Sequence, residues 1–135
     1  RRGGQEPQNE LVRWSDFTTR GGYEAMKSFL HGAGTPSAVF VTNYYMTIVA
    51  LMAVNETSIR VGQELSVVGF DRLDPIFLFK PELTVIQQPI EQMAREAADL
   101  LLRRMRSDFS DYPKKQVFAP TVHFGRSVRD VSGEV

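Results

Sequence analysis

Four short segments of the chain are almost continuously apolar, and each is followed by polar or turn-forming residues. They are residues 11–14 (LVRW), 37–42 (SAVFVT), 65–70 (LSVVGF) and 83–86 (LTVI). Continuous apolar runs of this length are typical of strands buried on both faces, as in parallel sheets. A fifth segment, QVFAPTVHF, predicts one or two edge strands interrupted at Pro120, because proline cannot donate a ladder hydrogen bond.

Between these strands the apolar residues recur at helical spacing. Thr18 or Thr19 is a suitable cap for a first helix, whose apolar face would be Tyr23, Met26, Phe29 and Leu30. A second helix, from about Tyr45 to Thr57, is apolar on nearly every side, so it is either deeply buried or shared with a partner. A third helix opens at Gln88-Pro89 and carries one apolar stripe: Ile90, Met93, Ala94, Ala97, Ala98, Leu101 and Met105.

Alternation of strands and helices predicts an α/β fold, in which a parallel sheet has helices on both faces. The 135 residues suit one domain. Acidic and basic residues number 16 each, which argues against direct nucleic-acid binding by this chain. The absence of cysteine excludes disulfides and thiol chemistry.

The longest apolar run and the N-terminal residues indicate where the protein is located in the cell. The run MTIVALMAV is far shorter than the about 20 residues that span a bilayer. The first residues, RRGGQEPQNE, lack Met and the apolar core of a signal peptide. We therefore expect a soluble cytoplasmic protein with no membrane partner, and a chain that is a piece of a longer one.

Polar or aromatic residues follow three of the predicted strands: Asp16-Phe17, Asn43 and Asp71. Ligands of parallel α/β sheets bind at the carboxyl ends of the strands, so we expect these side chains to converge there. Carboxylate and amide groups suit vicinal hydroxyls, and an aromatic ring suits the apolar face of a sugar. The alternatives are local: Asn43 as a helix cap, Asp71 as a turn residue, and Phe17 as part of the core.

Signals for an enzyme are weak. The chain has no G-x-S-x-G or H-E-x-x-H motif and no phosphate-binding glycine loop. His31 and His123 are too separated to suggest a metal site. We expect no catalytic residue, no metal and no cofactor, although a hydrolase or transferase that uses Asp71 as base or nucleophile stays as an alternative.

The segment after Asp71 contains four consecutive apolar residues in a predicted loop. Such a run on a surface favours an interface, with burial inside the protomer as the alternative. Together with the apolar second helix, it predicts a homodimer face formed by Ile76, Phe77, Leu78, Phe79, Met46 and Leu51.

The order of these motifs resembles the C-terminal part of the lactose-repressor (LacI/GalR) family of bacterial transcription regulators. The matching stretches are VTNYYM, RVGQELSVVGFDR, ELTVIQQP and QMAREAADLLL, within about residues 10–105. The resemblance implies a periplasmic-binding-protein-like (type I) C-terminal subdomain with an incomplete second subdomain. It also implies a homodimer, a small-molecule effector in the cleft, and operator binding only through a helix-turn-helix domain that this chain lacks.

The resemblance assigns residues and boundaries. Asp71 and Asn43 match effector-contacting positions, and Phe17 and Ile90 match positions that some members use; Asp16, Tyr44 and Arg72 complete the predicted effector site. Tyr44 and Arg72 each replace the family's aspartate, which puts the ligand type in doubt. We expect a partial effector-binding and dimerisation domain over residues 1–128: mostly C-terminal subdomain (10–87), crossing helix and loop (88–115) and closing strand (116–128), then a tail (129–135).

The predicted function is the effector-sensing and dimerising part of a LacI-type regulator that binds a sugar or related metabolite. The alternative is a periplasmic sugar-binding protein of a transport system, which shares the fold.

Overall fold

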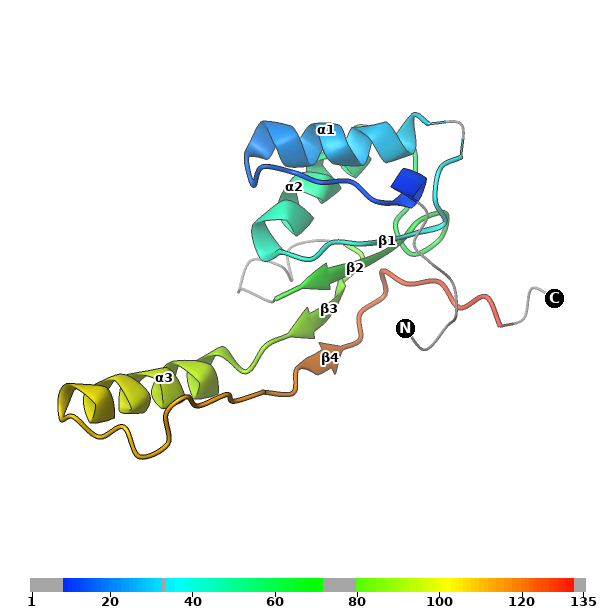
Figure 1. The fold of residues 1–135 in the computed structure, drawn as a ribbon. Coiled ribbons are helices and arrows are strands. Elements are labelled where there is room, and N and C mark those ends of the chain that lie inside the picture. The colour runs from blue at the N-terminus through cyan, green and yellow to red at the C-terminus, as the bar shows by residue number, and fades with distance from the viewer. Residues whose placement is uncertain (1–8, 33, 72–79, 133–135) are drawn as a thin grey trace.

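A computed structural model describes residues 9–32, 34–71 and 80–132. Along the chain come η1 (Asn9–Leu11), α1 (Thr19–Leu30), β1 (Ala38–Phe40), α2 (Tyr44–Asn55), β2 (Ser66–Phe70), β3 (Thr84–Gln87), α3 (Ile90–Met105) and β4 (Thr121–His123). Helices α1 and α2 lie together beside one face of the sheet, and α3 extends away from it (Figure 1). No helix of the described part is long and apolar enough to cross a membrane.

The sheet has the strand order β1-β2-β3-β4. Strands β1, β2 and β3 are parallel, with Phe40 opposite Val68 and Phe70 opposite Ile86. Strand β4 runs antiparallel to β3. The α/β class is therefore confirmed, and the sheet is mixed because the chain returns along β3 after α3. Strand β4 begins directly after Pro120, as its missing N–H predicts.

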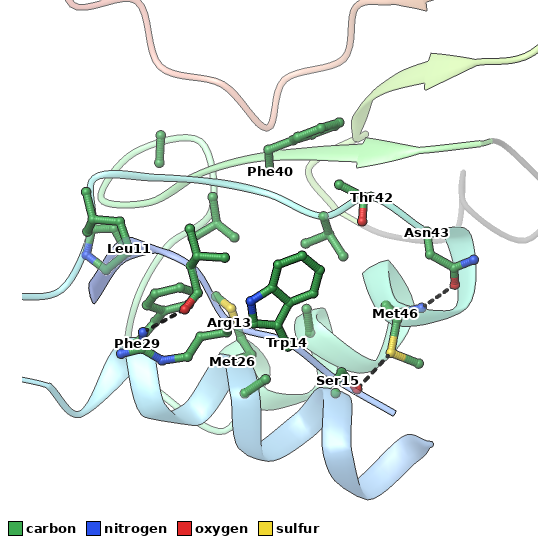
Figure 2. Close-up of a pocket in the computed structure, with 18 of the residues that line it drawn as sticks. Leu11, Arg13, Trp14, Ser15, Met26, Phe29, Phe40, Thr42, Asn43 and Met46 are labelled. Carbon is green, nitrogen blue, oxygen red and sulfur yellow. Dashed lines mark hydrogen bonds between the residues drawn. The ribbon is translucent and has the colours of Figure 1, made fainter. Parts of the chain in front are cut away.

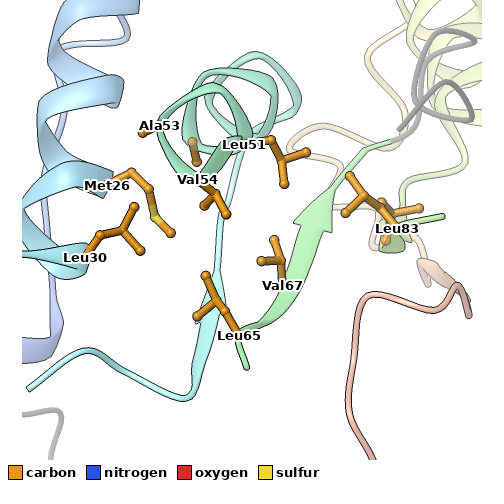
Figure 3. Close-up of a cluster of buried hydrophobic side chains, with 10 residues drawn as sticks. Met26, Leu30, Leu51, Ala53, Val54, Leu65, Val67 and Leu83 are labelled. Atoms are coloured by element: carbon orange, nitrogen blue, oxygen red, sulfur yellow. The ribbon is translucent and has the colours of Figure 1, made fainter. Parts of the chain in front are cut away.

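The core lies between the sheet and the helix pair. Leu65 and Val67 of the β2 segment face Val54 of α2, and Met26 and Leu30 of α1 close the cluster (Figure 3). Leu65 is fully buried and Val54 is 1% exposed. Full burial of such side chains contributes about 1.5–3 kcal/mol each. Helix α2 packs against α1 and against β2, while Met52 on its remaining side is 48% exposed.

This position of α2 decides part of the predicted dimer face. Met46 is 8% exposed and Leu51 is 4% exposed, both within the core of the single chain. The prediction that these two side chains form the dimer face is wrong, because they have almost no surface to offer. Residues 76–79, the rest of the predicted face, lie outside the described residues.

The strand predicted at residues 11–14 does not form. Leu11 ends the 3-10 helix η1, and Trp14 is 90% exposed. Arg13 is instead held by α1: its guanidinium lies 4.5 Å from the Phe29 ring centroid, and its Nε donates to Ser28 Oγ at 2.8 Å. These contacts anchor the segment to α1, so it does not add a strand to the outer edge of β1.

Helix α3 stands apart from the rest of the described structure. It has no buried residue and contacts no other described helix or strand. Its predicted apolar stripe is present but exposed, since Met105 is 73% and Leu101 62% accessible. The helix is stabilised at its own C-terminus, where Arg103 and Arg104 pair with two aspartates of the following turn, Asp108 and Asp111.

Candidate effector site at the carboxyl edge of the sheet

Two predicted site residues follow neighbouring parallel strands. Phe40 of β1 lies opposite Val68 of β2, and Val41 N still donates to Val68 O at 2.9 Å. Asn43 follows β1 and Asp71 follows β2, so both residues lie beyond the carboxyl ends of neighbouring parallel strands, at the same edge of the sheet.

Asn43 is the N-cap of α2. Its Oδ1 accepts a hydrogen bond from Met46 N at 3.1 Å, so the capping alternative is confirmed. Capping uses only the oxygen. Among the described residues nothing accepts a hydrogen bond from Asn43 Nδ2, and Figure 2 shows the amide nitrogen directed away from the helix. Asn43 is thus able to cap the helix and donate to a ligand at the same time.

Asp71 directly follows β2 with a positive φ of 64°. A non-glycine residue in this region is strained, and such strain is concentrated at functional sites. The backbone is fixed because Asp71 N donates to Ile86 O at 2.7 Å. The carboxylate is fixed by Gln88, whose Nε2 lies 3.2 Å from Oδ1 and 2.9 Å from Oδ2.

Gln88 is the site residue that the sequence prediction missed. It was interpreted only as the residue before Pro89 at the start of a helix, and its partner is 17 residues away in the chain. The available signal was its place: Gln88 follows β3, the neighbour of β2, so it leaves the sheet beside the residue after β2.

Phe17 shares the conformation of Asp71. Its φ is 60°, and 68% of the residue is exposed. Phe17 is therefore not a core residue, and its ring stays available to a ligand. Asp16 is different: its Oδ1 accepts hydrogen bonds from Thr18 Oγ1 and Thr18 N, which lower the pKa of Asp16 below the ordinary value of 3.8. Because its oxygen serves the turn into α1, we assign Asp16 a local structural role.

A cavity of about 530 Å³ lies between the segment 11–15, α1 and β1 (Figure 2). Its mostly apolar lining includes Trp14, Phe29 and Phe40, and its polar residues include Asn43 at one end; Phe17 also lines it. Asp71 is not part of this lining. The predicted site is thus divided between the cavity and the neighbouring strand end.

The remaining predicted site residues lie elsewhere. Ile90 begins α3, is 48% exposed and borders a separate open hollow formed by residues 87–92 and Arg95. Tyr44 begins α2 and packs against the core cluster. Arg72 lies outside the described residues. The described part contains no cluster of three acidic, histidine or cysteine side chains that could hold a metal.

Chemically, the strand ends present the Asp71 carboxylate and the Asn43 amide donor, and the cavity adds the exposed Phe17 ring. The carboxylate accepts hydrogen bonds, the amide donates them, and the ring offers an apolar face. This combination suits a neutral, hydroxyl-rich ligand better than an anion, since Asp71 would repel negative charge.

Comparison with known proteins identifies the family. Residues 1–128 match the family model described as periplasmic binding protein-like domain. The HTH-type transcriptional repressor PurR of Pectobacterium atrosepticum is 38% identical over 122 residues, which cover 90% of this chain and 36% of that protein. PurR of Edwardsiella ictaluri is 38% identical over 115 residues, covering 85% of this chain and 33% of that protein. The chain thus spans about a third of these relatives.

Solved structures give the same result. The transcriptional regulator CelR in complex with cellobiose superposes with a TM-score of 0.82 at 31% identity, over 92% of this chain and 38% of that one. A LacI family regulator from Enterococcus faecium with bound ribose superposes with a TM-score of 0.67 at 25% identity. The match covers 85% of this chain and 42% of that one. The lac repressor dimer bound to operator superposes with a TM-score of 0.74 over 86% of this chain and 40% of that one. Its identity to this chain is 24%, so it supports the fold alone. The chain therefore belongs to the family of periplasmic binding protein-like domains, in the form found as the effector-binding region of LacI/GalR regulators.

Proposed function

We propose that this chain is the effector-sensing and dimerising part of a LacI-type transcriptional regulator that acts in the cytoplasm. The effector is a sugar or related polyol bound at the carboxyl edge of the sheet. Operator DNA is contacted through a helix-turn-helix domain outside this chain. The whole protein is not an enzyme in this proposal, since its relatives are named as repressors.

The observation that carries the proposal is the positive φ of two residues, Phe17 just before α1 and Asp71 just after β2. Asn43, which follows β1, presents an amide donor at the same edge of the sheet as Asp71. A chain that needed only a turn at these places would be more stable with glycine there. The exposed Phe17 ring and the half-buried Asp71 carboxylate therefore support a ligand-binding role.

Two of the similar regulators and the geometry both support this class of ligand. One similar regulator was solved with cellobiose and another with ribose. In our proposal Asp71 accepts from effector hydroxyls, Asn43 donates through Nδ2, and the Phe17 ring packs against the apolar face of the ligand. Ile90, at the start of α3, adds an apolar contact.

The proposed mechanism is a shift between conformations. An effector that contacts both the sheet edge and the region around α3 binds best at one angle between them, so it increases the population of that angle. Two DNA-binding domains of a dimer must meet half-sites at a fixed spacing. A small change of angle therefore alters operator affinity.

The experiment that tests this function uses the full-length protein. An operator is first selected from random DNA, and its affinity is then measured by fluorescence anisotropy with each member of a panel of sugars and polyols. The proposal predicts that at least one compound changes operator affinity about 5- to 150-fold. A protein that selects no DNA sequence, or whose affinity no compound alters, would contradict it.

We further propose a homodimer with residues 76–79 at its face, since the lac repressor neighbour was solved as a dimer. Replacing Phe77 and Phe79 together by aspartate is expected to yield monomers, measured by light scattering. Met52→Asp, on the exposed side of α2, is the matched control and should leave the mass unchanged. A dimer that persists in the folded double variant would contradict this face.

A further inference from the structure

A side-chain contact between Asp71 and Gln88 joins the end of β2 to the start of α3. Asp71 follows β2 in the sheet, whereas Gln88 lies between β3 and the first residue of α3. Three hydrogen bonds connect them: Gln88 N to Oδ1 at 3.3 Å, and Nε2 to Oδ1 and Oδ2 at 3.2 and 2.9 Å. Both residues are half-buried, so water screens the contact only in part.

In the described residues, no other side-chain hydrogen bond connects the end of β2 with the start of α3. Helix α3 contacts no other described helix or strand. Ile90 N donates to Gln88 O at 2.9 Å, which makes Gln88 part of the turn that starts the helix. The pairing of Gln87 with Thr121 of β4 fixes the chain up to the end of β3. Beyond that point, the direction of the chain depends on Gln88, whose side chain is held by Asp71.

The carboxylate has limited room for further donors. Its two oxygens offer about four acceptor positions. Oδ1 already accepts two hydrogen bonds and Oδ2 accepts one, so one position on Oδ2 is left. A single hydroxyl fits there without disturbing Gln88. Two vicinal hydroxyls that donate to both oxygens must displace at least one Gln88 hydrogen bond from Oδ1.

We infer that Gln88 is a positioning residue that links the Asp71 carboxylate to the direction of α3. While Gln88 donates to both oxygens, α3 leaves the sheet at the angle seen in this structure. A diol that donates to both oxygens displaces the Gln88 amide, so that α3 can adopt other angles. This inference rests on the proposed function for its ligand, but the link itself exists without one.

The test measures the angle directly in the full-length protein without ligand. Spin labels are attached to Glu24→Cys on α1 and Asp99→Cys on α3, both exposed, and their distance distribution is measured by pulsed electron resonance. This chain has no cysteine of its own, and any cysteine elsewhere in the protein is replaced first. Gln88→Glu, which sets a carboxylate against Asp71, is expected to shift or broaden the distribution.

Two further variants make the result specific. Asp71→Asn combined with Gln88→Glu exchanges amide and carboxylate, so it should restore the original distribution. Gln87→Glu changes the adjacent glutamine, which makes no hydrogen bond to Asp71, and should leave the distribution unchanged. If Gln88→Glu does not fold, Gln88→Met, which keeps the length and removes the amide, replaces it.

An unchanged distribution in folded Gln88→Glu, an equal shift in Gln87→Glu, or no restoration in the exchanged pair would each overturn the inference. Failure of the proposed function would look different: no compound would alter operator affinity, while Gln88→Glu would still change the distance distribution and the exchanged pair and Gln87→Glu would not. Addition of cellobiose or ribose to the labelled wild-type protein then tests diol displacement, which predicts a distribution close to that of Gln88→Glu for a compound that binds.

Discussion

Phe17 and Asp71, which are 54 positions apart in the numbering, share the same left-handed backbone conformation, with φ of 60° and 64°. Each follows a segment predicted as a strand, and each precedes a change of chain direction. Left-handed conformation costs about 1–2 kcal/mol for residues with a Cβ atom. Phe17 and Asp71 are both residues of the proposed effector site, so the strained backbone coincides with that site.

A first prediction concerns the strain at Phe17. Phe17→Gly should leave the free energy of unfolding unchanged or raise it by up to about 1 kcal/mol, because the exposed ring contributes little burial and glycine tolerates the positive φ. Phe17→Val should lower it by about 1–2 kcal/mol, because a β-branched residue is strained there. Urea unfolding measures both. A loss of more than about 2 kcal/mol in Phe17→Gly would show that the ring is a packing residue after all.

The second prediction concerns the close approach of Gly125 to β3. A Cβ atom on Gly125 would overlap Glu82 O and the backbone of Leu83. Gly125→Ala should therefore lower the free energy of unfolding by about 1–3 kcal/mol. Gly34 has no atom within 4 Å of the corresponding position, so Gly34→Ala is the control and should be neutral. Equal stability of the two variants in urea unfolding would disprove the described path of the returning chain.

Ser127 anchors the same returning segment. It is fully buried, its Oγ donates to Val67 O, and it accepts from Thr84 N at 2.8 Å. Ser127→Ala would leave both backbone groups without a partner, which costs about 1–3 kcal/mol. Ser132→Ala, in an exposed turn, should cost less than about 0.5 kcal/mol. Thermal unfolding distinguishes them, and a Ser127→Ala variant as stable as Ser132→Ala would contradict the buried contact.

The C-terminus of α3 should depend on acidic pH. A hydrogen bond from Arg103 holds the pKa of Asp108 far below its ordinary 3.8, and one from Arg104 lowers the pKa of Asp111. A lowered folded-state pKa stabilises the folded form above the unfolded value, about 3.9, and this contribution is lost as the pH falls through that value toward the folded one. Carbon chemical shifts of residues 100–105 should therefore lose helical character below about pH 4.

The matched control for this pH dependence is Arg103→Met combined with Arg104→Met. Without the guanidinium groups the end of α3 should already be frayed at neutral pH and should change little on acidification. Shifts at neutral pH that are as helical in this double variant as in the wild-type protein would mean that the ion pairs do not support α3.

The elements of the fold were predictable where the apolar pattern is local. Strands β2 and β3 and helix α3 follow from runs and stripes within single segments. The conformation of residues 11–14, where a strand was expected, could not be predicted in this way. It depends on the contact of Arg13 with Phe29 of α1, which the local sequence pattern does not indicate. The burial of Met46 and Leu51 likewise depends on α1 covering α2, so an all-apolar helix alone left two interpretations open.

The candidate site was predictable only in part. Strand topology places Asn43 and Asp71 at the same edge of the sheet, and that followed from sequence because the carboxyl ends of parallel strands share one edge. The hydrogen bonds of Gln88 to Asp71 and the turn role of Asp16 depend on rotamers and backbone angles, which the pattern of residue types does not encode. The positive φ values at Phe17 and Asp71 were equally invisible in the sequence.

The central claim is that a hydroxyl-rich effector binds at Asp71, and thermal unfolding of the full-length protein tests it most directly. Wild type, Asp71→Ala and the control Asp99→Ala, an exposed residue of α3, are each measured against cellobiose, ribose, sugar phosphates and nucleosides. A ligand at one hundred times its Kd stabilises the folded state by about 2.7 kcal/mol. We expect a sugar or other polyol that stabilises wild type and Asp99→Ala and has no effect on Asp71→Ala. A compound that stabilises all three proteins equally, or no stabilising compound for the folded wild type, would contradict it.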